Sequence, residues 1–128
     1  MAQVNQDVTD AELAVLQALW DGEPATIRQL SETVYRDGGG SSYATVQKLL
    51  ERLEAKAFVA RDRSGSVHVF RAALNRDELI RRRLRAVADT LCGGSLTPLL
   101  TSLVQGEPLS DRDLRTLRAL IDDLDQRV

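Results

Sequence analysis

The sequence predicts a mainly α-helical protein, in which a winged helix-turn-helix domain (residues 1–74) precedes a helical dimerisation region (residues 75–128). Two observations lead to this fold class. Three short amphipathic helical patterns come before one pair of β-favouring runs around a glycine-containing turn, which is the order of a winged helix with a small β-hairpin wing. Beyond residue 74 only leucine-rich helical patterns follow, and they offer many apolar side chains in a short stretch.

The first helix is expected to begin after Thr9, because Thr9 and Glu12 have the spacing of a capping box, which satisfies free backbone N–H groups. Its apolar side chains recur at helical spacing, at Leu13, Leu16, Leu19 and Trp20. Residues 21–24, Asp-Gly-Glu-Pro, should end it, because glycine suits a left-handed cap and proline disfavours helix in the residue before it.

Two further helices are expected before the hairpin. Thr26 and Gln29 repeat the capping pattern in front of an apolar stripe formed by Ile27, Leu30 and Val34, and residues 37–40 break this helix. A third helix, roughly residues 42–57, is expected to be capped by Ser41 or Ser42. One narrow stripe of this helix should be buried: Val46, Leu49, Leu50 and Leu53.

The period then changes from helical to extended. Residues 58–61 and 67–70 favour β-strands and flank residues 62–66, a turn in which Gly65 can adopt positive φ. We expect these runs to form the wing.

The C-terminal part is expected to consist of helices that begin at the capping residues Asn75 and Ser110, with Gly93 and Gly94 ending the first of them. Packing within one chain could hide their apolar stripes, but a partner chain would cover them more naturally. The predicted dimerisation residues are Ile80, Leu84, Val87, Leu91, Leu99, Leu103, Leu114, Leu117, Ile121 and Leu124.

Composition excludes several classes of protein. The chain has 128 residues, of which 43% are apolar and 28% charged, so it is expected to fold as a globular protein. Its one cysteine excludes a disulfide framework within the chain. No apolar run could span a membrane, and the N-terminus has neither region of a secretory signal. We therefore expect a cytoplasmic protein with no membrane partner.

The sequence contains no set of residues that would support enzyme catalysis. His68 lies in a predicted strand and is more simply a surface residue than a metal ligand, and Cys92 is more simply an unreactive thiol than a nucleophile or sensor. The glycines at 38–40 lack the strand and the following Lys-Ser/Thr of a phosphate loop. We therefore predict no enzyme activity, no metal and no cofactor.

The charge distribution permits a nucleic-acid partner despite the net charge of −2, but does not prove one. Residues 1–27 carry −5, residues 28–85 carry +6 and residues 86–128 carry −3, so the middle of the chain can present a positive face. The second helix of a helix-turn-helix enters the major groove with its first turns.

The predicted base contacts come from the first two turns of the third helix, where glutamine can bind adenine, lysine guanine and alanine the thymine methyl. Nearby hydroxyls and the arginines around the hairpin suit phosphates. The predicted DNA-binding residues are Ser42, Tyr43, Ala44, Thr45, Gln47, Lys48, Arg61, Arg63 and Arg71. Glu51 would repel a phosphate, and the arginines at 81–83 and 85 are expected to be solvated rather than to touch the DNA backbone.

Several segments together resemble the penicillinase-repressor family of the BlaI/MecI/CopY type. They are residues 12–20 (ELAVLQALW), 42–46 (SYATV), 49–53 (LLERL), the 61–70 hairpin, and 93–95 before the leucine-rich helices. The resemblance runs from about residue 8 to 125. It implies a homodimeric transcriptional repressor on a palindromic double-stranded DNA operator, with contacts from residues 42–45, 47 and 48 and from the region of Arg63, and with Trp20 and Leu53 in the core.

The sequence departs from the family pattern at four places. Lys56-Ala57 stands where a Lys-Gly is frequent, and Gly65-Ser66 where a Gly-Arg is frequent. The Asn-Phe bond that an upstream sensor protease cuts in antibiotic-responsive members aligns with Ser102-Leu103, which argues against that partner. The C-terminal cysteines of copper-responsive members are absent from this sequence, which argues against copper sensing.

Two other functions stay open at this point. The same winged helix could be a protein-interaction module that does not bind DNA, which failure to bind any duplex at low salt would indicate. A repressor could also hold a small-molecule pocket in its helical half, although the leucine stripes offer few polar groups for a polar ligand.

Overall fold

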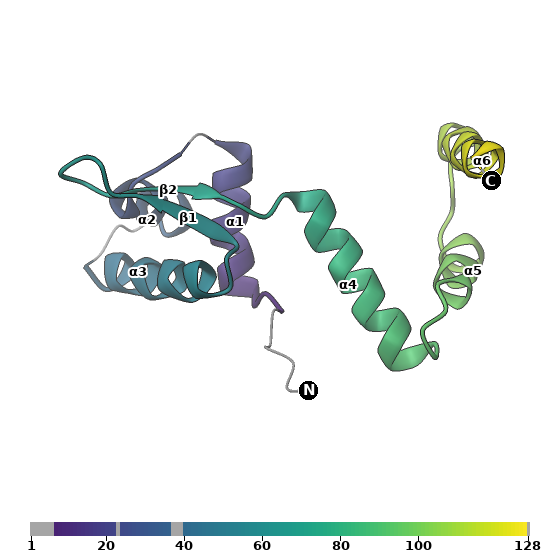
Figure 1. The fold of residues 1–128 in the computed structure, drawn as a ribbon, viewed down its shortest axis with the longest axis horizontal. Helices are drawn as coiled ribbons and strands as arrows, with labels where there is room; N and C mark the ends of the chain where they lie inside the picture. Colours follow the sequence, from purple (N-terminus) through teal and green to yellow (C-terminus); the bar gives the residue numbers. More distant parts are fainter. Residues whose placement is uncertain (1–6, 23, 37–39, 128) are drawn as a thin grey trace. The chain divides into compact units, whose positions relative to one another are not determined.

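The computed structural model describes residues 7–22, 24–36 and 40–127 (Figure 1). In these residues the chain is mainly helical with one two-stranded antiparallel hairpin, which confirms the predicted fold class. In chain order the elements are α1 (Asp10–Asp21), α2 (Ile27–Val34), α3 (Gly40–Ala55), β1 (Val59–Asp62), β2 (Val69–Ala72), α4 (Arg76–Leu91), α5 (Thr97–Gly106) and α6 (Asp111–Gln126).

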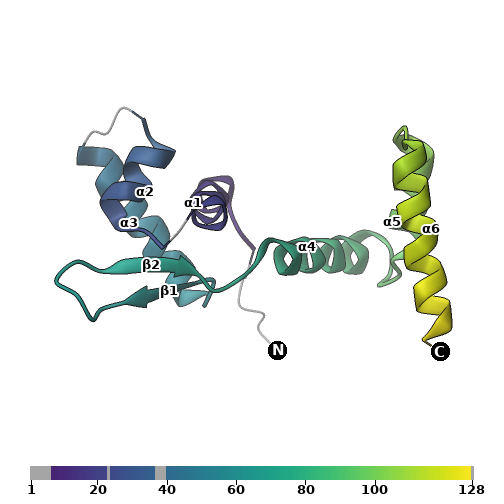
Figure 2. The ribbon, with the colours of Figure 1, turned by 90° about the horizontal axis from the view of Figure 1, so that it is seen from above.

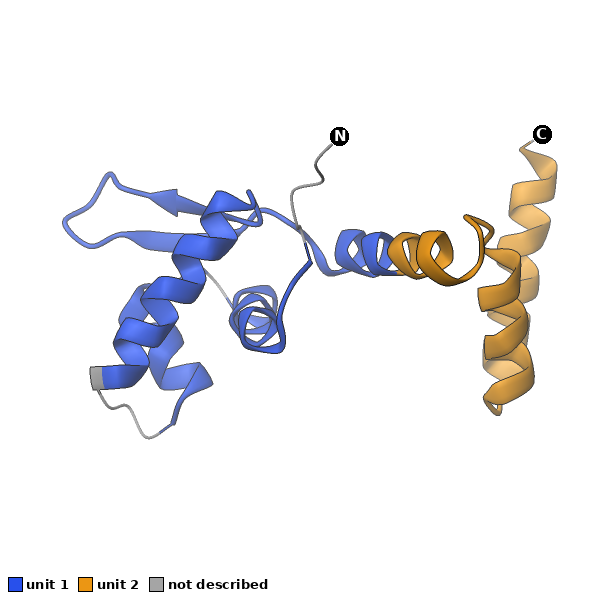
Figure 3. Ribbon diagram, turned by 90° about the horizontal axis from the view of Figure 1, so that it is seen from below, with its two compact units in different colours: residues 1–83 blue, residues 84–128 orange. Residues whose placement is uncertain are grey.

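The chain divides into two compact units, residues 1–83 and 84–128 (Figure 3). The division falls inside α4 and not at residue 74, because the first half of α4 packs onto the winged helix. Leu79 belongs to the buried core of unit 1, and Arg83 donates a hydrogen bond to the carbonyl of Val8. The functional domains 1–74 and 75–128 stay a prediction.

The core of unit 1 lies where α1, α2 and α3 meet one another and the hairpin (Figure 2). The predicted stripes supply most of it, since the structure buries Leu16, Leu19, Leu30, Val46, Leu49, Leu50 and Leu53 together with Phe58 and Phe70. Leu13, Trp20, Ile27 and Val34 are only partly buried against this core. Trp20 keeps its indole N–H at the edge of the core, where it donates to the carbonyl of Leu74 at 2.7 Å.

Local capping signals locate the starts of α1 and α2 correctly. Thr9 with Glu12 and Thr26 with Gln29 both form complete capping boxes, with N···O distances between 2.9 and 3.2 Å. The end of α1 differs from the prediction, because Gly22 has an extended backbone (φ −117°) rather than a left-handed one. Its amide still donates to the carbonyl of Ala18, so the helix ends without a left-handed residue.

Helix α3 begins and ends two residues earlier than predicted. Ser41 and Ser42 lie inside the helix and do not cap it. At the other end the amide of Phe58 donates to the carbonyl of Leu53, and that of Ala57 to the carbonyl of Glu54. These two bonds form a Schellman motif, which needs a left-handed residue and here places Ala57 at φ 65°. The alanine stands where the family pattern has glycine.

Ala57→Gly should therefore stabilise unit 1 by about 1 kcal/mol, because a left-handed backbone is costly for alanine and not for glycine. Urea denaturation followed by circular dichroism measures the difference. Ala55→Gly, two residues earlier in the helical conformation, is the matched control and should destabilise by up to about 1 kcal/mol. Equal destabilisation by both variants would contradict the strain at Ala57.

The hairpin is shifted from its predicted position. The strands are 59–62 and 69–72 rather than 58–61 and 67–70, so the connecting loop is longer. The sequence missed one element: Ala25 exchanges two backbone hydrogen bonds with Phe70, of 2.8 and 2.9 Å. This bridge attaches the segment between α1 and α2 to the inner strand of the wing.

The later helices follow their predicted starts and stops. The amide of Glu78 donates to the Asn75 side chain, and that of Asp113 to the hydroxyl of Ser110. Gly93 and Gly94 end α4 with φ of 60° and 88°. Among the described residues no helix is long and apolar enough to cross a bilayer.

Large apolar side chains are exposed along α4, α5 and α6. They include nine of the predicted dimerisation residues, namely Ile80, Leu84, Val87, Leu91, Leu103, Leu114, Leu117, Ile121 and Leu124, together with Leu96, Leu100, Val104 and Leu120. The tenth predicted residue, Leu99, is half-buried. Neither α5 nor α6 has a buried side chain.

Candidate nucleic-acid interface

Helix α3 packs against α2. It is amphipathic, with one apolar face and one polar face. Val46, Leu50 and Leu53 point into the core and are fully buried. The first two turns leave the predicted base-contacting residues exposed, namely Tyr43, Ala44, Gln47 and Lys48. These four side chains form a row that an approaching duplex could contact, and we call them the α3 row.

The two hydroxyl residues beside this row are not equivalent. The side chain of Ser42 is turned inward and the residue is only 7% exposed, because α3 begins at Gly40 and not at Ser42. It therefore does not belong to the exposed face, contrary to the expectation that it contacts phosphate. Thr45 is exposed, and its Oγ1 donates to the carbonyl of Ser41 at 2.8 Å, which leaves the oxygen lone pairs free to accept.

Arg61 in β1 is held by three neighbours within unit 1. Its Nη2 lies 2.8 Å from Oε1 of Glu54, its Nη1 lies 3.4 Å from Nδ1 of His68, and its guanidinium carbon lies 4.8 Å from the ring centre of Phe70. The side chain is 19% exposed. This environment differs from the phosphate-facing position expected from the sequence, because the last turn of α3 supplies a counter-ion for Arg61.

Arg63 and Arg71 are the exposed cations of the hairpin. Arg63 is 65% exposed and lies 3.6 Å from Oε2 of Glu54, beyond hydrogen-bonding distance. Arg71 is exposed on β2, opposite Ala60. Both can reach an external anion without breaking a short hydrogen bond.

The Asp62 carboxylate is hydrogen-bonded within the loop that follows β1, so it is not a free anion beside Arg63 and Arg71. Its Oδ1 accepts hydrogen bonds from the Ser64 hydroxyl at 2.7 Å and the Ser64 amide at 2.9 Å. These bonds, together with the positive charge of Arg71, lower the pKa of the Asp62 carboxyl below its ordinary value. The carboxylate therefore stays ionised and keeps the loop turn in place.

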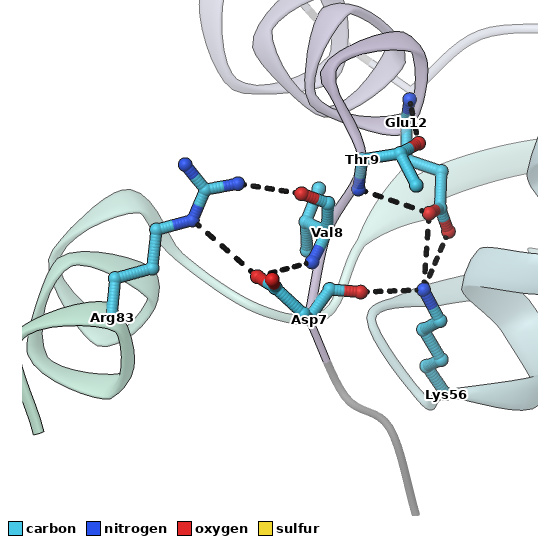
Figure 4. A network of polar contacts seen from close by, with 6 residues as sticks. All are labelled: Asp7, Val8, Thr9, Glu12, Lys56 and Arg83. Atoms are coloured by element: carbon cyan, nitrogen blue, oxygen red, sulfur yellow. Dashed lines mark hydrogen bonds and ion pairs between the residues drawn. The ribbon is translucent and has the colours of Figure 1, made fainter. Parts of the chain in front are cut away.

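A network of polar contacts that the sequence did not reveal joins the N-terminal segment to two helices (Figure 4). Glu12, only 1% exposed, accepts from Lys56 Nζ at 2.9 and 3.0 Å, and Lys56 also donates to the carbonyl of Asp7 at 2.6 Å. Arg83 of α4 donates to the carbonyl of Val8 at 2.6 Å. The capping box predicted the hydrogen bonds of Glu12 at the start of α1, but not its contact with Lys56.

The arginines at the start of α4 are more structural than predicted. The guanidinium of Arg82 lies 5.2 Å from the ring centre of Phe58, and Arg85 donates to the carbonyl of Gly94 at 2.8 Å. Arg82 and Arg85 are exposed and Arg83 is half-buried with its hydrogen bond to Val8, so these side chains are partly solvated, as expected, and also make contacts within the protein.

The residues singled out for enzyme chemistry do not converge. His68 is exposed on the hairpin beside Arg61, whereas Cys92 is a half-buried free thiol at the end of α4. In the part of the chain that the structure describes, no three side chains of histidine, cysteine, aspartate or glutamate gather as a metal site would require.

Comparison of the sequence with known proteins shows the family of this chain. Residues 8–123 match the profile of a family described as penicillinase repressor. The chain is 19% identical to a penicillinase repressor of Staphylococcus aureus over 127 residues, which cover 99% of this chain and 100% of that protein. It is 38% identical to the transcriptional regulator BlaI of Mycobacterium tuberculosis (strains CDC 1551 and H37Rv) over 74 residues, which cover 56% of this chain and 51% of that protein. The chain therefore belongs to the penicillinase repressor family, whose proteins are transcriptional repressors.

Proposed function

We propose that this chain represses transcription as a homodimer that binds a palindromic DNA operator. The observation that carries the proposal is the α3 row, exposed at the start of the second helix of a helix-turn-helix pair and accompanied by the exposed arginines 63 and 71 of the wing. In such a pair the first turns of the second helix reach base edges in the major groove, and a positively charged hairpin lies along phosphates.

The chemistry of the row suits base recognition. Gln47 can bond adenine in the bidentate mode, Lys48 can donate to guanine, and Ala44 can pack on a thymine methyl. Tyr43 and Thr45 carry hydroxyls for phosphates or sugars. We leave Ser42 and Arg61 out of the proposed contacts, because unit 1 already holds both side chains.

The exposed apolar faces of α4 to α6 support a second copy of the chain as the partner. Water-exposed leucine stripes on three successive helices cost free energy that burial against an identical surface recovers. A dimer would also give two reading helices, which matches a palindromic operator with half-sites about one helical turn or a multiple of it apart.

We assign no catalytic role, metal or cofactor, and we leave a sensor protease out of the proposed partners. The bond that aligns with the family's cleaved Asn-Phe bond, Ser102–Leu103, lies inside helix α5. A helical segment must unwind before a protease can bind it as an extended strand.

The test is fluorescence-anisotropy binding to the duplex upstream of the protein's own gene, with a random duplex as competitor, over a salt series. We expect selective binding by two chains per site and a steep loss of affinity with salt. Equal weak binding to both duplexes would move the search to genome-wide operator selection. No binding at low salt, with one stoichiometric protein partner co-purifying, would select the protein-interaction module instead.

Lys48→Ala should lower affinity for the operator about tenfold or more and affinity for a random duplex much less, because each dimer loses two base contacts. Arg28→Ala is the matched control: it removes the same charge from an exposed side chain of α2 that lies 4.0 Å from Glu32. We expect this control to keep its selectivity. If Lys48→Ala bound the operator as tightly as the parent, the choice of reading helix would be wrong.

A further inference from the structure

The Glu54 carboxylate lies at an electrostatically unfavourable place. It belongs to the last turn of α3, which ends at Ala55, and the C-terminal end of a helix carries partial negative charge. Two wing arginines compensate it: Arg61 at 2.8 Å on Oε1 and Arg63 at 3.6 Å on Oε2. One carboxylate therefore connects the end of the proposed reading helix with the wing.

The two arginines differ in how firmly they are held. Arg61 has a short hydrogen bond to Glu54, a ring beneath it and a histidine beside it, and it is largely shielded from water. Arg63 has a longer contact to the same carboxylate and is mostly in solvent, where an ion pair contributes little. Arg61 is therefore the firmly held counter-ion of Glu54, whereas Arg63 can leave at small cost.

We propose that Glu54 is a positioning residue with two effects. It fixes Arg61 as a structural part of the wing, and it binds Arg63 loosely until a duplex binds, when Arg63 moves to a DNA phosphate. This inference rests on the proposed DNA binding. Because the exchange involves a phosphate and no base, Glu54 lowers affinity for every duplex by the same factor and keeps non-specific binding weak.

Glu54→Gln tests the exchange, since glutamine keeps an acceptor for Arg61 and loses the charge that attracts Arg63. We expect affinity to rise about two- to fivefold per chain, equally for the operator and a random duplex. In an Arg63→Ala background the same substitution should give a smaller gain, no larger than that of Glu51→Gln, because the exchanging cation is absent. Arg63→Ala alone should reduce the slope of log affinity against log salt by about one per chain.

Glu51→Gln is the matched control. It removes the same charge from an exposed side chain of α3 and should raise affinity by a factor that does not depend on residue 63. Urea unfolding of each variant shows whether the fold is retained, and a conservative Glu54→Asp, with a shorter side chain that still carries charge, should not reproduce the gain.

The outcomes separate the two proposals. If the parent binds no duplex at low salt, the proposed function fails and the exchange fails with it. If the parent binds but Glu54→Gln gives no gain, or a gain that is undiminished with Arg63→Ala, only the role of Glu54 is overturned. A gain confined to the operator would also overturn it, because it would indicate a base contact.

Discussion

Replacing Lys56 by methionine should destabilise unit 1 by about 3 kcal/mol, the largest loss of stability that we expect from one polar side chain. Methionine has a similar length and no charge, so the substitution leaves the Glu12 carboxylate nearly buried without its cation. The carbonyl of Asp7 also loses its donor. Removing one partner of a buried pair costs more than the pair itself contributes, because the remaining charge stays desolvated.

The double variant Glu12→Gln/Lys56→Met is the control for this reasoning. Glutamine keeps the capping box with Thr9 and removes the buried charge, so the double variant should recover about 2 kcal/mol relative to Lys56→Met alone. Glu12→Gln alone should cost about 1 kcal/mol, because Lys56 can turn to water. Urea denaturation at neutral pH measures the cycle, and a Lys56→Met protein as stable as the parent would show that the pair is dispensable.

The cost of Lys56→Met should also shrink in acid. Burial raises the pKa of the Glu12 carboxyl. Hydrogen bonds from Lys56 and Thr9 and the charge of Lys56 lower the pKa by more than burial raises it, so the pKa lies below its ordinary value of 4.5. A carboxyl with a lowered folded-state pKa contributes stability that is present above pH 4.5 and lost as pH falls through the folded-state value. Comparing parent and variant at about pH 7 and about pH 4 checks the direction.

Placing a charge on the apolar face of α6 should break the proposed dimer and lower operator affinity about a hundredfold or more. Ile121 is 60% exposed and lies in a stripe with Leu114, Leu117 and Leu124. In Ile121→Asp an interface between two copies would have to bury two carboxylates without counter-ions. Each freed chain would then hold a single half-site and lose the advantage of binding both at once.

Ala119→Asp is the matched control, because at 100° per residue it lies on the opposite side of α6 and is exposed. Sedimentation velocity should give a dimer for the parent and for Ala119→Asp, and a monomer for Ile121→Asp at micromolar concentration. Binding to an isolated half-site should be the same for all three proteins. A dimeric Ile121→Asp protein would exclude this face of α6 from the interface.

The exposed α3 row could be predicted because it depends on one helix alone. Once Val46, Leu50 and Leu53 identify the buried stripe, the helical period places Gln47 and Lys48 on the other side. The burial of Ser42 could not be predicted in this way, because it depends on where α3 begins. The helix starts earlier than the serine caps suggested. The shift of the hairpin has a similar origin, since its β-favouring residues do not specify their register.

The sequence alone determined the fold class, the family and most helix starts, since capping boxes and apolar periods depend on residues three or four apart that lie on the same helix. The tertiary structure alone decided which charges are free. Glu12 meets Lys56 across 44 residues, and the last turn of α3 meets Arg61 only after the hairpin has folded back. No local pattern specifies such pairs, because only packing brings distant segments within the few ångströms over which an ion pair and a hydrogen bond act.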